Sequence, residues 1–417
     1  MVPAPIFYPN IDYADPAVVT PMPLPFNVVQ NTIICVVGVG FVGESLLKEF
    51  GNVFKSIGYD KSEKRIQDLT SAFKSFGKVK LTSDETALAA ATHYLISVPT
   101  LLRPDRSVNL DYVHAAVKTV LKYARPGCTI VIESSVCVGT TREILGPYKN
   151  ILHCGMSPER VDPGRTFPTA DKIPKLISGL TPMSLKAISQ IYSKVFETVV
   201  PVSKPEVAEM TKLYENCYRM VNIAYVNEMS DACRSHGIDP FEMINAATTK
   251  PYGFQAFYPG LGVGGHCLHE NAEYLFANNK NLPVLERATK LMWARPKKLA
   301  RKFHRRSISD PTNDRNGVLP RILVVGVGFK PGQSVLSNSP GLSFAQRLND
   351  TGCARLAFYD PLVSQDKVRW MEKLDDACWN PSYIDAEFDS IAICTKHPGV
   401  DFGVVERLQR AFVRCFV

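Results

Sequence analysis

The sequence lacks any paired-cysteine spacing, and this absence limits the kinds of protein it can encode. Its 417 residues include 11 cysteines, an odd number, and no two of them are separated by just two residues. Neither a disulfide framework nor a zinc knuckle is therefore encoded by spacing. We expect reduced thiols in a cytoplasmic protein, most of them small buried hydrophobes such as Cys35, Cys154 and Cys394.

A long uninterrupted hydrophobic run is also missing. The most apolar window, residues 32–47, contains three glycines and Glu44, so we predict no membrane span and no membrane partner. Residues 1–30 hold seven prolines and no basic segment followed by an apolar one, so no secretory signal is expected. We interpret residues 1–31 as a Pro-rich N-terminal arm.

The excess of one charge is small: 48 Lys and Arg stand against 40 Asp and Glu, a formal net charge of +8. The densest basic run, residues 295–306, contains no acid. We interpret it as a solvated helix end that leads into a linker, residues 307–319. The alternative is a nucleic-acid patch, but no nucleic-acid motif supports it, so no nucleic-acid partner is expected.

What the sequence does contain is a glycine turn between two expected strands. A β-branched run at residues 32–37 leads into Gly38-Val-Gly-Phe-Val-Gly43, and an expected helix at 44–50 and a second apolar run at 53–59 end at Asp60. This order is the dinucleotide-binding arrangement, in which helix amides hold the phosphates. Asp60 would accept from the ribose hydroxyls, which favours NAD over NADP. The candidate cofactor-binding residues here are Gly38, Val39, Gly40, Phe41, Val42, Gly43, Asp60 and Arg65. Two roles remain open for Arg65 and the nearby Lys61: contact with a phosphate, or an ordinary charge on the helix surface.

Two further expected strands end in hydroxyl-bearing residues. The run at 93–98 is followed by Thr100, and the run at 129–133 is followed by Ser135. Ligands of open α/β sheets lie beyond the carboxyl ends of the strands, so both residues are candidates for the cofactor site. Capping of the following helix or turn is the alternative for each.

The pattern then changes to long helices and back to α/β. Residues 206–236 carry one apolar stripe at helical spacing, and strands are expected again at 321–325, 357–360 and 390–394, with a second glycine turn at 326–328. We predict an α/β protein with two Rossmann-like domains joined by a central helical region that contains one long helix. The expected divisions are an arm (1–31), an NAD-binding domain (32–202), a central helical domain (203–306), a linker (307–319) and a C-terminal Rossmann-like domain (320–417).

One glycine-rich loop ends in a cysteine. Residues 259–267 read Pro-Gly-Leu-Gly-Val-Gly-Gly-His-Cys, a composition that suits a backbone pressed against a ligand. A thiol opposite an NAD site can attack an aldehyde, and the adduct can be oxidised to a thioester. A flexible surface turn with an incidental cysteine is the alternative.

With these motifs in order, the sequence resembles the UDP-glucose/GDP-mannose dehydrogenase family, which oxidises C6 of a nucleotide sugar to the acid with two NAD. The resemblance rests on the first glycine turn with Asp60, on residues 98–100, 134–141 and 157–164, on Lys212 with Asn216, on the Gly-Gly-His-Cys267 loop and on Gly328-Phe-Lys330. The stretch at 157–164 is most similar to the branch that acts on UDP-N-acetylhexosamines. The resemblance implies a UDP-sugar substrate (UDP-GlcNAc, UDP-ManNAc or UDP-glucose) and a homodimer or higher homo-oligomer, and it implies no metal.

The resemblance also implies the roles of individual residues. Cys267 would be the nucleophile, Lys212 and Asn216 would stabilise the oxyanion, and Glu159 would transfer protons as a carboxylate tuned by burial. A solvated helix lysine and a plain salt bridge are the alternatives for Lys212 and Glu159. The residues implied to bind the UDP-sugar are Glu159, Arg160, Val161, Lys212, Asn216, Phe257, Tyr258, Pro259, Gly260, Gly264 and Lys330.

The sequence departs from the family in several places. The family's catalytic aspartate is Asn271, an amide that cannot act as a base. The acids and the arginine that the family has after Phe-Lys are Ser334, Val335 and Ser337 in this sequence. The loss of the arginine removes a guanidinium that is expected to contact the cofactor. We therefore expect a functional or slowed 6-dehydrogenase. Two alternatives stay open: a catalytically impaired paralogue that binds nucleotide sugar in a regulatory or hetero-oligomeric role, and an enzyme that stops at a different step on a nucleotide sugar.

Overall fold

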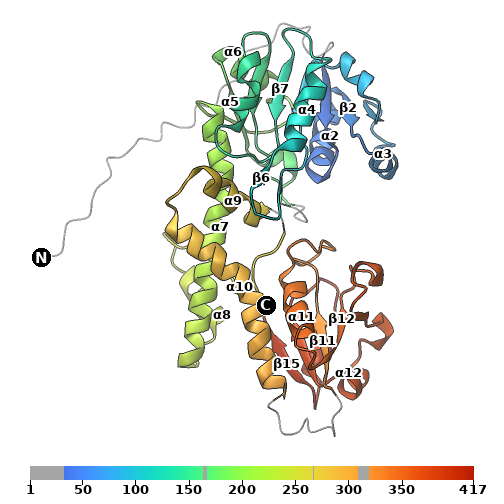
Figure 1. The fold of residues 1–417 in the computed structure, drawn as a ribbon, viewed down its shortest axis with the longest axis vertical. Coiled ribbons are helices and arrows are strands. Elements are labelled where there is room, and N and C mark those ends of the chain that lie inside the picture. The colour runs from blue at the N-terminus through green and yellow to red at the C-terminus, as the bar shows by residue number, and fades with distance from the viewer. Residues whose placement is uncertain (1–31, 163–166, 266, 309–318) are drawn as a thin grey trace, which may run out of the picture. The chain divides into compact units, whose positions relative to one another are not determined.

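The computed structural model describes residues 32–162, 167–265, 267–308 and 319–417 (Figure 1). The Pro-rich arm and most of the expected linker therefore lie outside the described residues. The chain divides into two compact units, Met1–Lys212 (unit 1) and Leu213–Val417 (unit 2). The finer division expected from the sequence stays a prediction.

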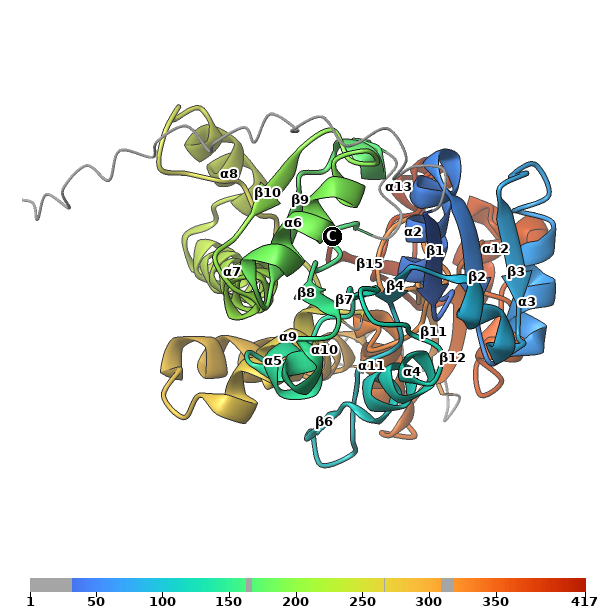
Figure 2. The same ribbon diagram turned by 90° about the horizontal axis from the view of Figure 1, so that it is seen from above.

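Unit 1 is built on an eight-stranded sheet with the order β10-β9-β8-β7-β4-β1-β2-β3, which can be followed in Figure 2. All neighbouring strands run parallel except β8 and β9, which are antiparallel. The strands are β1 (Ile33–Val37), β2 (Lys55–Tyr59), β3 (Val79–Thr82), β4 (His93–Ile96), β7 (Thr129–Ile132), β8 (His153–Met156), β9 (Lys175–Gly179) and β10 (Val199–Pro201). A small hairpin pairs β5 (Leu101–Leu102) with β6 (Val108–Asn109).

Helices cover both faces of this sheet. The helices of unit 1 are α2 (Phe41–Val53), α3 (Glu63–Thr70), α4 (Asp111–Leu121), α5 (Thr140–Leu145) and α6 (Pro182–Tyr192). Apolar residues of α2, α3 and α6 pack on one face, and those of α4 and α5 pack on the other. Near-continuous apolar strands such as β1 are explained by this arrangement, because a parallel sheet covered on both sides is buried on both sides.

Unit 2 contains a helical segment and a second sheet. Its helices are α8 (Pro240–Thr248), α9 (Cys267–Asn278), α10 (Pro283–Ile308), α11 (Pro340–Asn349), α12 (Pro381–Glu387) and α13 (Gly403–Glu406). The sheet is parallel with the order β13-β12-β11-β14-β15. Its strands are β11 (Arg321–Val325), β12 (Arg355–Tyr359), β13 (Glu372–Lys373), β14 (Ser390–Ile393) and β15 (Phe412–Cys415). Helices α10 and α11 pack on one face, and α12 and α13 pack on the other.

The long helix predicted from the apolar stripe is α7 (Pro205–Cys233), which is followed by one 3₁₀ turn to His236. The expected strands match within two or three residues. The predicted bounds of the first helix are wrong. Helix α2 begins at Phe41 rather than at residue 44, and it ends at Val53, a residue that was expected to lie in the second strand. The buried cysteines are confirmed, since Cys35, Cys154 and Cys394 are at most 3% exposed.

The two sheets begin with the same local arrangement. The N–H of Gly38 donates to Tyr59 O, and the N–H of Gly326 donates to Tyr359 O, each over 2.8 Å and each at a positive φ that favours glycine. In each case the turn connects a first strand to the carboxyl end of its neighbour. The prediction of two Rossmann-like folds is confirmed by this repetition.

Candidate active site

The first glycine turn is shaped by close approaches that leave no room for side chains. A Cβ placed on Gly43 would lie 1.9 Å from the carbonyl oxygen of Gly38, and one on Gly38 would lie 2.9 Å from the carbonyl oxygen of Ser97. Gly43 therefore lets the first turn of α2 pack on the strand end, as the fingerprint predicts.

Gly40 differs from its neighbours because the space around it is open. It is the N-cap residue of α2, and a Cβ placed on it would meet nothing within 4 Å. Asp60 closes the other side of the turn, since its Oδ2 accepts from the N–H of Val39 over 3.1 Å. An exposed helix N-terminus with free approach to the backbone suits a pyrophosphate. The residues present here fit NAD.

Two residues beside the turn are placed by side-chain contacts. Arg65 donates from Nε to the carbonyl oxygen of Val39 over 2.7 Å and pairs with Glu44 over 2.8 Å. Lys61 is exposed and lies over the ring of Tyr112. The guanidinium of Arg65 thus braces the glycine turn, a role that neither sequence alternative anticipated. Phe41 is 54% exposed at the start of α2, and Val42 is half-buried behind it.

The hydroxyls of Thr100 and Ser135 follow neighbouring strands of the same sheet. Strands β1, β4 and β7 are neighbours and run parallel, so their carboxyl ends lie at the same edge of the sheet. Thr100 and Ser135 therefore follow the strands at the edge where the glycine turn lies. The N-cap positions of the next α-helices are Leu110 for α4 and Gly139 for α5. Neither Thr100 nor Ser135 is therefore the N-cap residue of the α-helix that follows it. Their cofactor role stays a prediction that this placement supports.

Glu159 is buried in a loop after β8 and is held by three donors. Its Oε1 accepts from the N–H groups of Arg160 and Val161 over 2.7 and 2.8 Å, and its Oε2 lies 2.7 Å from Nζ of Lys175. Burial alone would raise the pKa of Glu159, but the ammonium of Lys175 and the two backbone donors lower it. Burial and the salt bridge named as the alternative are thus both present at Glu159, and its role in proton transfer stays a prediction.

Lys175 links Glu159 to a second buried carboxylate. Its Nζ also lies 2.8 Å from Glu133 Oε2, and the hydroxyl of Tyr192 donates to Glu133 Oε1. Complete burial raises the pKa of Glu133 to about 7 despite the charge of Lys175. We call Glu133, Glu159, Lys175 and Tyr192 the buried cluster. Lys175 was not predicted from the sequence, although a lysine that opens the apolar run of β9 is a usable signal.

The two residues implied to stabilise the oxyanion, Lys212 and Asn216, both belong to α7 and are four residues apart, as predicted. Lys212 is half-buried and Asn216 is buried. In unit 2, Asn216 Nδ2 donates to Asn271 Oδ1 over 2.7 Å. The structure thus brings together the retained asparagine and the position where the family's aspartate is missing.

The glycine-rich loop is anchored at both ends. The N–H of Gly260 donates to Asn227 Oδ1 over 3.0 Å, and its carbonyl oxygen accepts from Arg295 Nε over 3.1 Å. The N–H of Gly265 donates to Ser337 O over 3.0 Å, and Asn338 Nδ2 donates to Gly265 O over 3.0 Å. Gly260 and Gly265 are therefore both held by hydrogen bonds, which argues against the flexible-turn alternative. Ser337, a departure from the family, acts here through its backbone.

Other expected substrate residues line or follow this loop. Phe329 lies against Gly264 and Gly265, where added Cβ atoms would come within 2.9 and 3.0 Å of it. Lys330 follows directly, half-buried beyond the carboxyl end of β11. The aromatic side chains of the loop pack locally, with Phe257 against Tyr218, Tyr258 stacked on Phe241, and Pro259 buried. Arg160, in unit 1, donates to the carbonyl oxygen of Pro174 over 2.8 Å.

Helix α9 begins at Cys267, so the predicted nucleophile occupies the first turn of a 12-residue helix. The position of its side chain lies outside the described residues, as does His266. His269 is buried with its ring 3.9 Å from that of Trp293 and its Nε2 2.9 Å from the carbonyl oxygen of Val263. His269 therefore packs within unit 2 through its ring and its Nε2 contact.

Two other features are absent from the described ranges. No three His, Cys, Asp or Glu side chains come together there so as to hold a metal ion. No described helix has the length and apolar character needed to cross a membrane.

Comparison with known proteins gives two matching family models. The model of the UDP-glucose/GDP-mannose dehydrogenase family, NAD binding domain, matches residues 63–196, and the model of the central domain of that family matches residues 206–292. Together they cover more than half of the chain.

Individual relatives match over most of their length. The UDP-N-acetyl-D-mannosamine dehydrogenase of Salmonella typhi is 28% identical over 382 residues, which are 83% of this chain and 89% of the relative. The solved UDP-D-ManNAc dehydrogenase of Pyrococcus horikoshii superposes with a TM-score of 0.82 at 24% identity, over 92% of this chain and 95% of the other. A UDP-glucose dehydrogenase of Pyrobaculum islandicum superposes with a TM-score of 0.78 at 21% identity, over 94% and 96% of the two chains. The two superpositions establish a shared fold.

Proposed function

The chain belongs to the UDP-glucose/GDP-mannose dehydrogenase family, and we propose that it oxidises C6 of a UDP-N-acetylhexosamine from alcohol to acid through a thioester on Cys267. It is an NAD-dependent nucleotide-sugar dehydrogenase by family. The relatives that match over most of their length are named UDP-N-acetyl-D-mannosamine dehydrogenases, which makes UDP-ManNAc the first substrate to test.

One observation carries this proposal: Asn216 is bonded to Asn271, the residue one helical turn beyond Cys267. The bond fixes α9 against α7 within unit 2, so the start of α9 keeps a set position relative to the Asn216 amide. A thiol at a helix N-terminus is favoured as the thiolate by the helix dipole. The nucleophile and an oxyanion donor are thereby held on two helices that touch.

In the proposed reaction, each of four side chains has a role. Lys212 and Asn216 donate to the oxygen on C6, which carries negative charge in both oxidations. Cys267 adds to the aldehyde, forming a carbon–sulfur bond and a thiohemiacetal. The first glycine turn would hold NAD, which would supply the hydride acceptor for each oxidation. Glu159 orders the water that cleaves the resulting thioester, which restores the thiol and releases the acid.

Asn271 makes the last step the slow one in this proposal. An amide can accept the hydrogen bond from Asn216 and can orient a water, but it cannot take the proton of that water. Glu159 is a weak base as long as Lys175 holds its carboxylate. The proposed enzyme is therefore active but slow in thioester hydrolysis.

The product distinguishes this function from the alternatives. We expect mass spectrometry of a reaction with UDP-ManNAc and NAD to show a product with one more oxygen and two fewer hydrogens than the substrate. A product two hydrogens lighter, without added oxygen, would instead indicate an enzyme that stops at the aldehyde. Binding of the UDP-sugar without any product would indicate a silent binding protein.

We further propose that the chain assembles as a homodimer through α7. Tyr214 and Tyr225, eleven residues apart and so on one side of the helix, are 65% and 63% exposed. Exposed aromatics of this size are typical of interfaces. Light scattering during size exclusion should give a dimer mass, and the variant Tyr214→Glu/Tyr225→Glu should give a monomer. A wild-type monomer would contradict the proposal.

A further inference from the structure

Each of the two glycine turns is closed by an aspartate at the end of the neighbouring strand. In unit 1, Asp60 Oδ2 accepts from the N–H of Val39 over 3.1 Å. In unit 2, Asp360 Oδ2 accepts from the N–H groups of Val327 and Gly328 over 2.9 and 3.0 Å. Asp360 is therefore the counterpart of Asp60 in the second sheet.

The two aspartates differ in their surroundings. Asp60 is half-buried, whereas Asp360 is fully buried and lies with Oδ2 3.1 Å from Nε2 of His397. His397 comes four residues after the end of β14, as Thr100 comes four residues after the end of β4. Strands β14 and β4 hold the same place in their sheets, since they pair with β11 and β1. The carboxylate expected to accept from a ribose in unit 1 is thus bonded to a histidine in unit 2.

The second glycine turn also differs in the segment that follows it. In unit 1, α2 begins directly after Gly40. In unit 2, residues 329–338, which we call the insertion, separate Gly328 from the N-cap of α11. A Cβ placed on Gly328 would lie 2.5 Å from the carbonyl oxygen of Gln333, whereas one on Gly40 would meet nothing within 4 Å. The insertion therefore closes the approach that unit 1 leaves open for a pyrophosphate.

His397 connects the insertion to the buried aspartate. Its Nδ1 accepts from the N–H of Gly332 over 3.2 Å. Because a backbone N–H can only donate, Nδ1 carries no proton in this bond, and Nε2 is the ring nitrogen that donates to Asp360. Burial alone would raise the pKa of Asp360, but the bonds from His397 and from backbone N–H groups lower it. The imidazole thus links Gly332 to a buried carboxylate.

The linked segment carries a residue implied to bind the UDP-sugar. Lys330 lies two residues before Gly332, and its carbonyl oxygen accepts from the N–H of Gln333 over 3.3 Å. The N–H of Phe329 donates to the carbonyl oxygen of Val335 over 3.0 Å. The chain therefore folds back on itself on both sides of Gly332, and a contact at Gly332 restrains the whole turn.

We propose that His397 is a positioning residue for the UDP-sugar, because it fixes the turn that carries Lys330 by tying Gly332 to the second sheet. This inference rests on the proposed function, in which Lys330 binds the substrate. An imidazole suits the role, since it presents one donor and one acceptor from a rigid ring. A lysine on a turn held in this way loses less freedom when the ligand binds, which favours affinity.

The end of the insertion nearest α11 has a different contact. There the N–H of Gly265 donates to Ser337 O, and Asn338 Nδ2 donates to Gly265 O, each over 3.0 Å. These bonds hold the glycine-rich loop and do not involve His397. Cutting the histidine link should therefore affect substrate binding more than the chemistry at that loop.

The other end of the glycine-rich loop is held by the basic run of α10. Arg295, which donates to Gly260 O, is 6% exposed and pairs with Asp231 over 2.9 Å. The interpretation of this run as a solvated helix end is therefore wrong for Arg295. Lys297 and Lys298 of the same run are exposed, as that interpretation expects.

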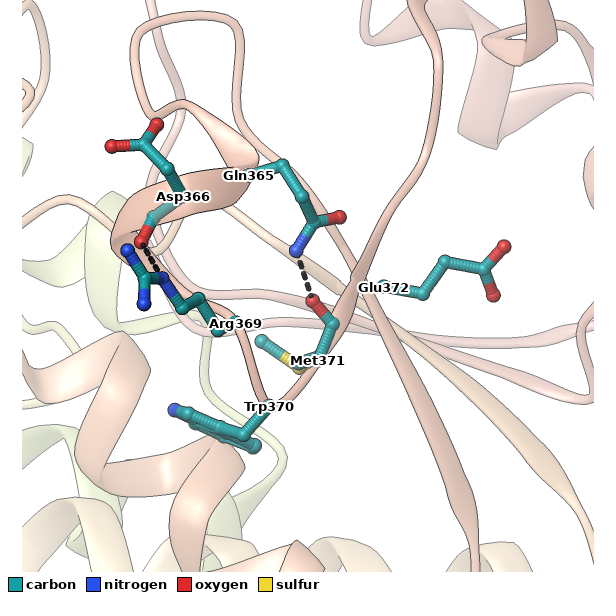
Figure 3. A pocket seen from close by; sticks show the side chains of 6 residues that line it. All are labelled: Gln365, Asp366, Arg369, Trp370, Met371 and Glu372. Carbon is teal, nitrogen blue, oxygen red and sulfur yellow. Dashed lines mark hydrogen bonds between the residues drawn. The ribbon is translucent and has the colours of Figure 1, made fainter.

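A hollow of about 760 Å³ in unit 2 lies apart from the insertion in sequence. It is lined by residues 365, 366 and 369–372 (Figure 3). Gln365 Nε2 donates to Met371 O over 3.0 Å, and Arg369 Nε donates to Asp366 O over 3.2 Å. These polar groups hold their own loop, so the hollow gives less indication of a ligand than the insertion does.

The experiment is calorimetric titration of the full chain with UDP and, without NAD, with UDP-ManNAc, so that no turnover is needed. Two variants cut the link at opposite ends. His397→Gln can still reach Asp360 but loses the acceptor for Gly332, and His397→Asn keeps that acceptor but does not reach Asp360. Each should weaken binding of both ligands by about fivefold or more, the value of about one hydrogen bond. Affinity for NAD should stay within about twofold, and His304→Gln, the same change on α10, should leave all three affinities within about twofold.

A double-mutant cycle tests whether His397 acts through Lys330. In the Lys330→Ala background, His397→Gln should change the affinity for UDP-ManNAc by less than about twofold, because the contact that it positions is already gone. In the otherwise wild-type chain, His397→Gln should raise KM for UDP-ManNAc and leave kcat unchanged. Asp360 keeps its backbone donors in every variant, so the variants should fold, and melting curves check this.

Several results would overturn the inference. Unchanged affinity in either folded His397 variant would do so, and so would an equal loss in the Lys330→Ala background, which would indicate general damage to unit 2. A lower kcat with unchanged KM would assign the link to the chemistry instead. A wild-type chain that binds neither UDP nor UDP-ManNAc contradicts the proposed substrate and overturns the inference with it. A chain that binds UDP-ManNAc but forms no NADH contradicts the proposed oxidation alone, and the binding data still decide the role of His397.

Discussion

The side-chain amide of Asn216 donates to the side-chain oxygen of Asn271 over 2.7 Å, and both side chains are buried. The family's aspartate at this position is gone, but its hydrogen-bond acceptor is kept. In the proposed reaction, Asn271 therefore keeps an acceptor for Asn216 but supplies no base. Substitutions at residue 271 can test the hydrogen bond and the missing base separately.

The variant Asn271→Asp should raise kcat by about tenfold or more, because a carboxylate at this position can take the proton of the hydrolytic water. It should also lower the free energy of unfolding by about 1–3 kcal/mol, since the position is 2% exposed and the new charge is desolvated. Steady-state NADH formation and urea unfolding measure the two effects.

The matched control is Asn271→Ala, which removes the acceptor for Asn216 without adding a base. It should lower kcat and leave the affinity for NAD unchanged. If neither substitution changes kcat, Asn271 does not act in the reaction and the proposed slow step is wrong.

Lys175 should be essential for the stability of unit 1. Replacing it by Met leaves Glu133 and Glu159 buried without a cation, which typically costs about 3–5 kcal/mol. Urea unfolding should show this loss for Lys175→Met at neutral pH, with a smaller loss for Lys175→Arg. A Lys175→Met protein as stable as the wild type would mean that the buried cluster contributes little.

Glu133 should make stability depend on pH in a predictable direction. Because its pKa is raised from 4.5 to about 7 in the folded protein, the folded state keeps a proton that the unfolded chain releases within this window. Stability therefore falls as the pH rises through the window, by an amount on the order of 3 kcal/mol. Glu133→Gln removes this titration, so its stability relative to the wild type should rise between about pH 5 and pH 8. Parallel melting temperatures of the two proteins over this pH range would contradict this prediction.

Two glycines of the first turn should respond differently to alanine. Gly40→Ala adds a Cβ in open space, so the fold should be unaffected, but the Cβ occupies the approach to the α2 amides and should weaken NAD binding by about tenfold. Gly43→Ala places a Cβ 1.9 Å from Gly38 O and should destabilise the protein by about 1–3 kcal/mol or more. Urea unfolding and NAD titration separate the two effects. Equal NAD affinity for Gly40→Ala and wild type would contradict the pyrophosphate assignment.

The fold was largely predictable from local pattern. Apolar runs ending in glycine turns predicted β1 and β11, and the stripe on residues 206–236 predicted α7. Boundaries were less certain because packing decides them: α2 begins directly after Gly40, since the turn and the helix share residues.

The candidate site was predictable only where residues are close in sequence. The bond between Asn216 and Asn271 joins residues 55 apart, and the link from Lys175 to Glu133 joins residues 42 apart. The sequence offers no spacing rule for such contacts, because they depend on how strands and helices pack. For the same reason the sequence did not reveal that Lys175, 16 residues from Glu159, helps to lower the pKa of that carboxyl.

The central claim is the conversion of a UDP-sugar to its acid through Cys267, and the stoichiometry of NADH formation tests it most directly. With UDP-ManNAc and excess NAD, the wild-type chain should form two NADH for each sugar nucleotide converted to acid, and Cys267→Ala should form none beyond the background. The same assay with UDP-GlcNAc and UDP-glucose ranks the substrates. The absence of NADH above the Cys267→Ala level with all three sugars would contradict the account.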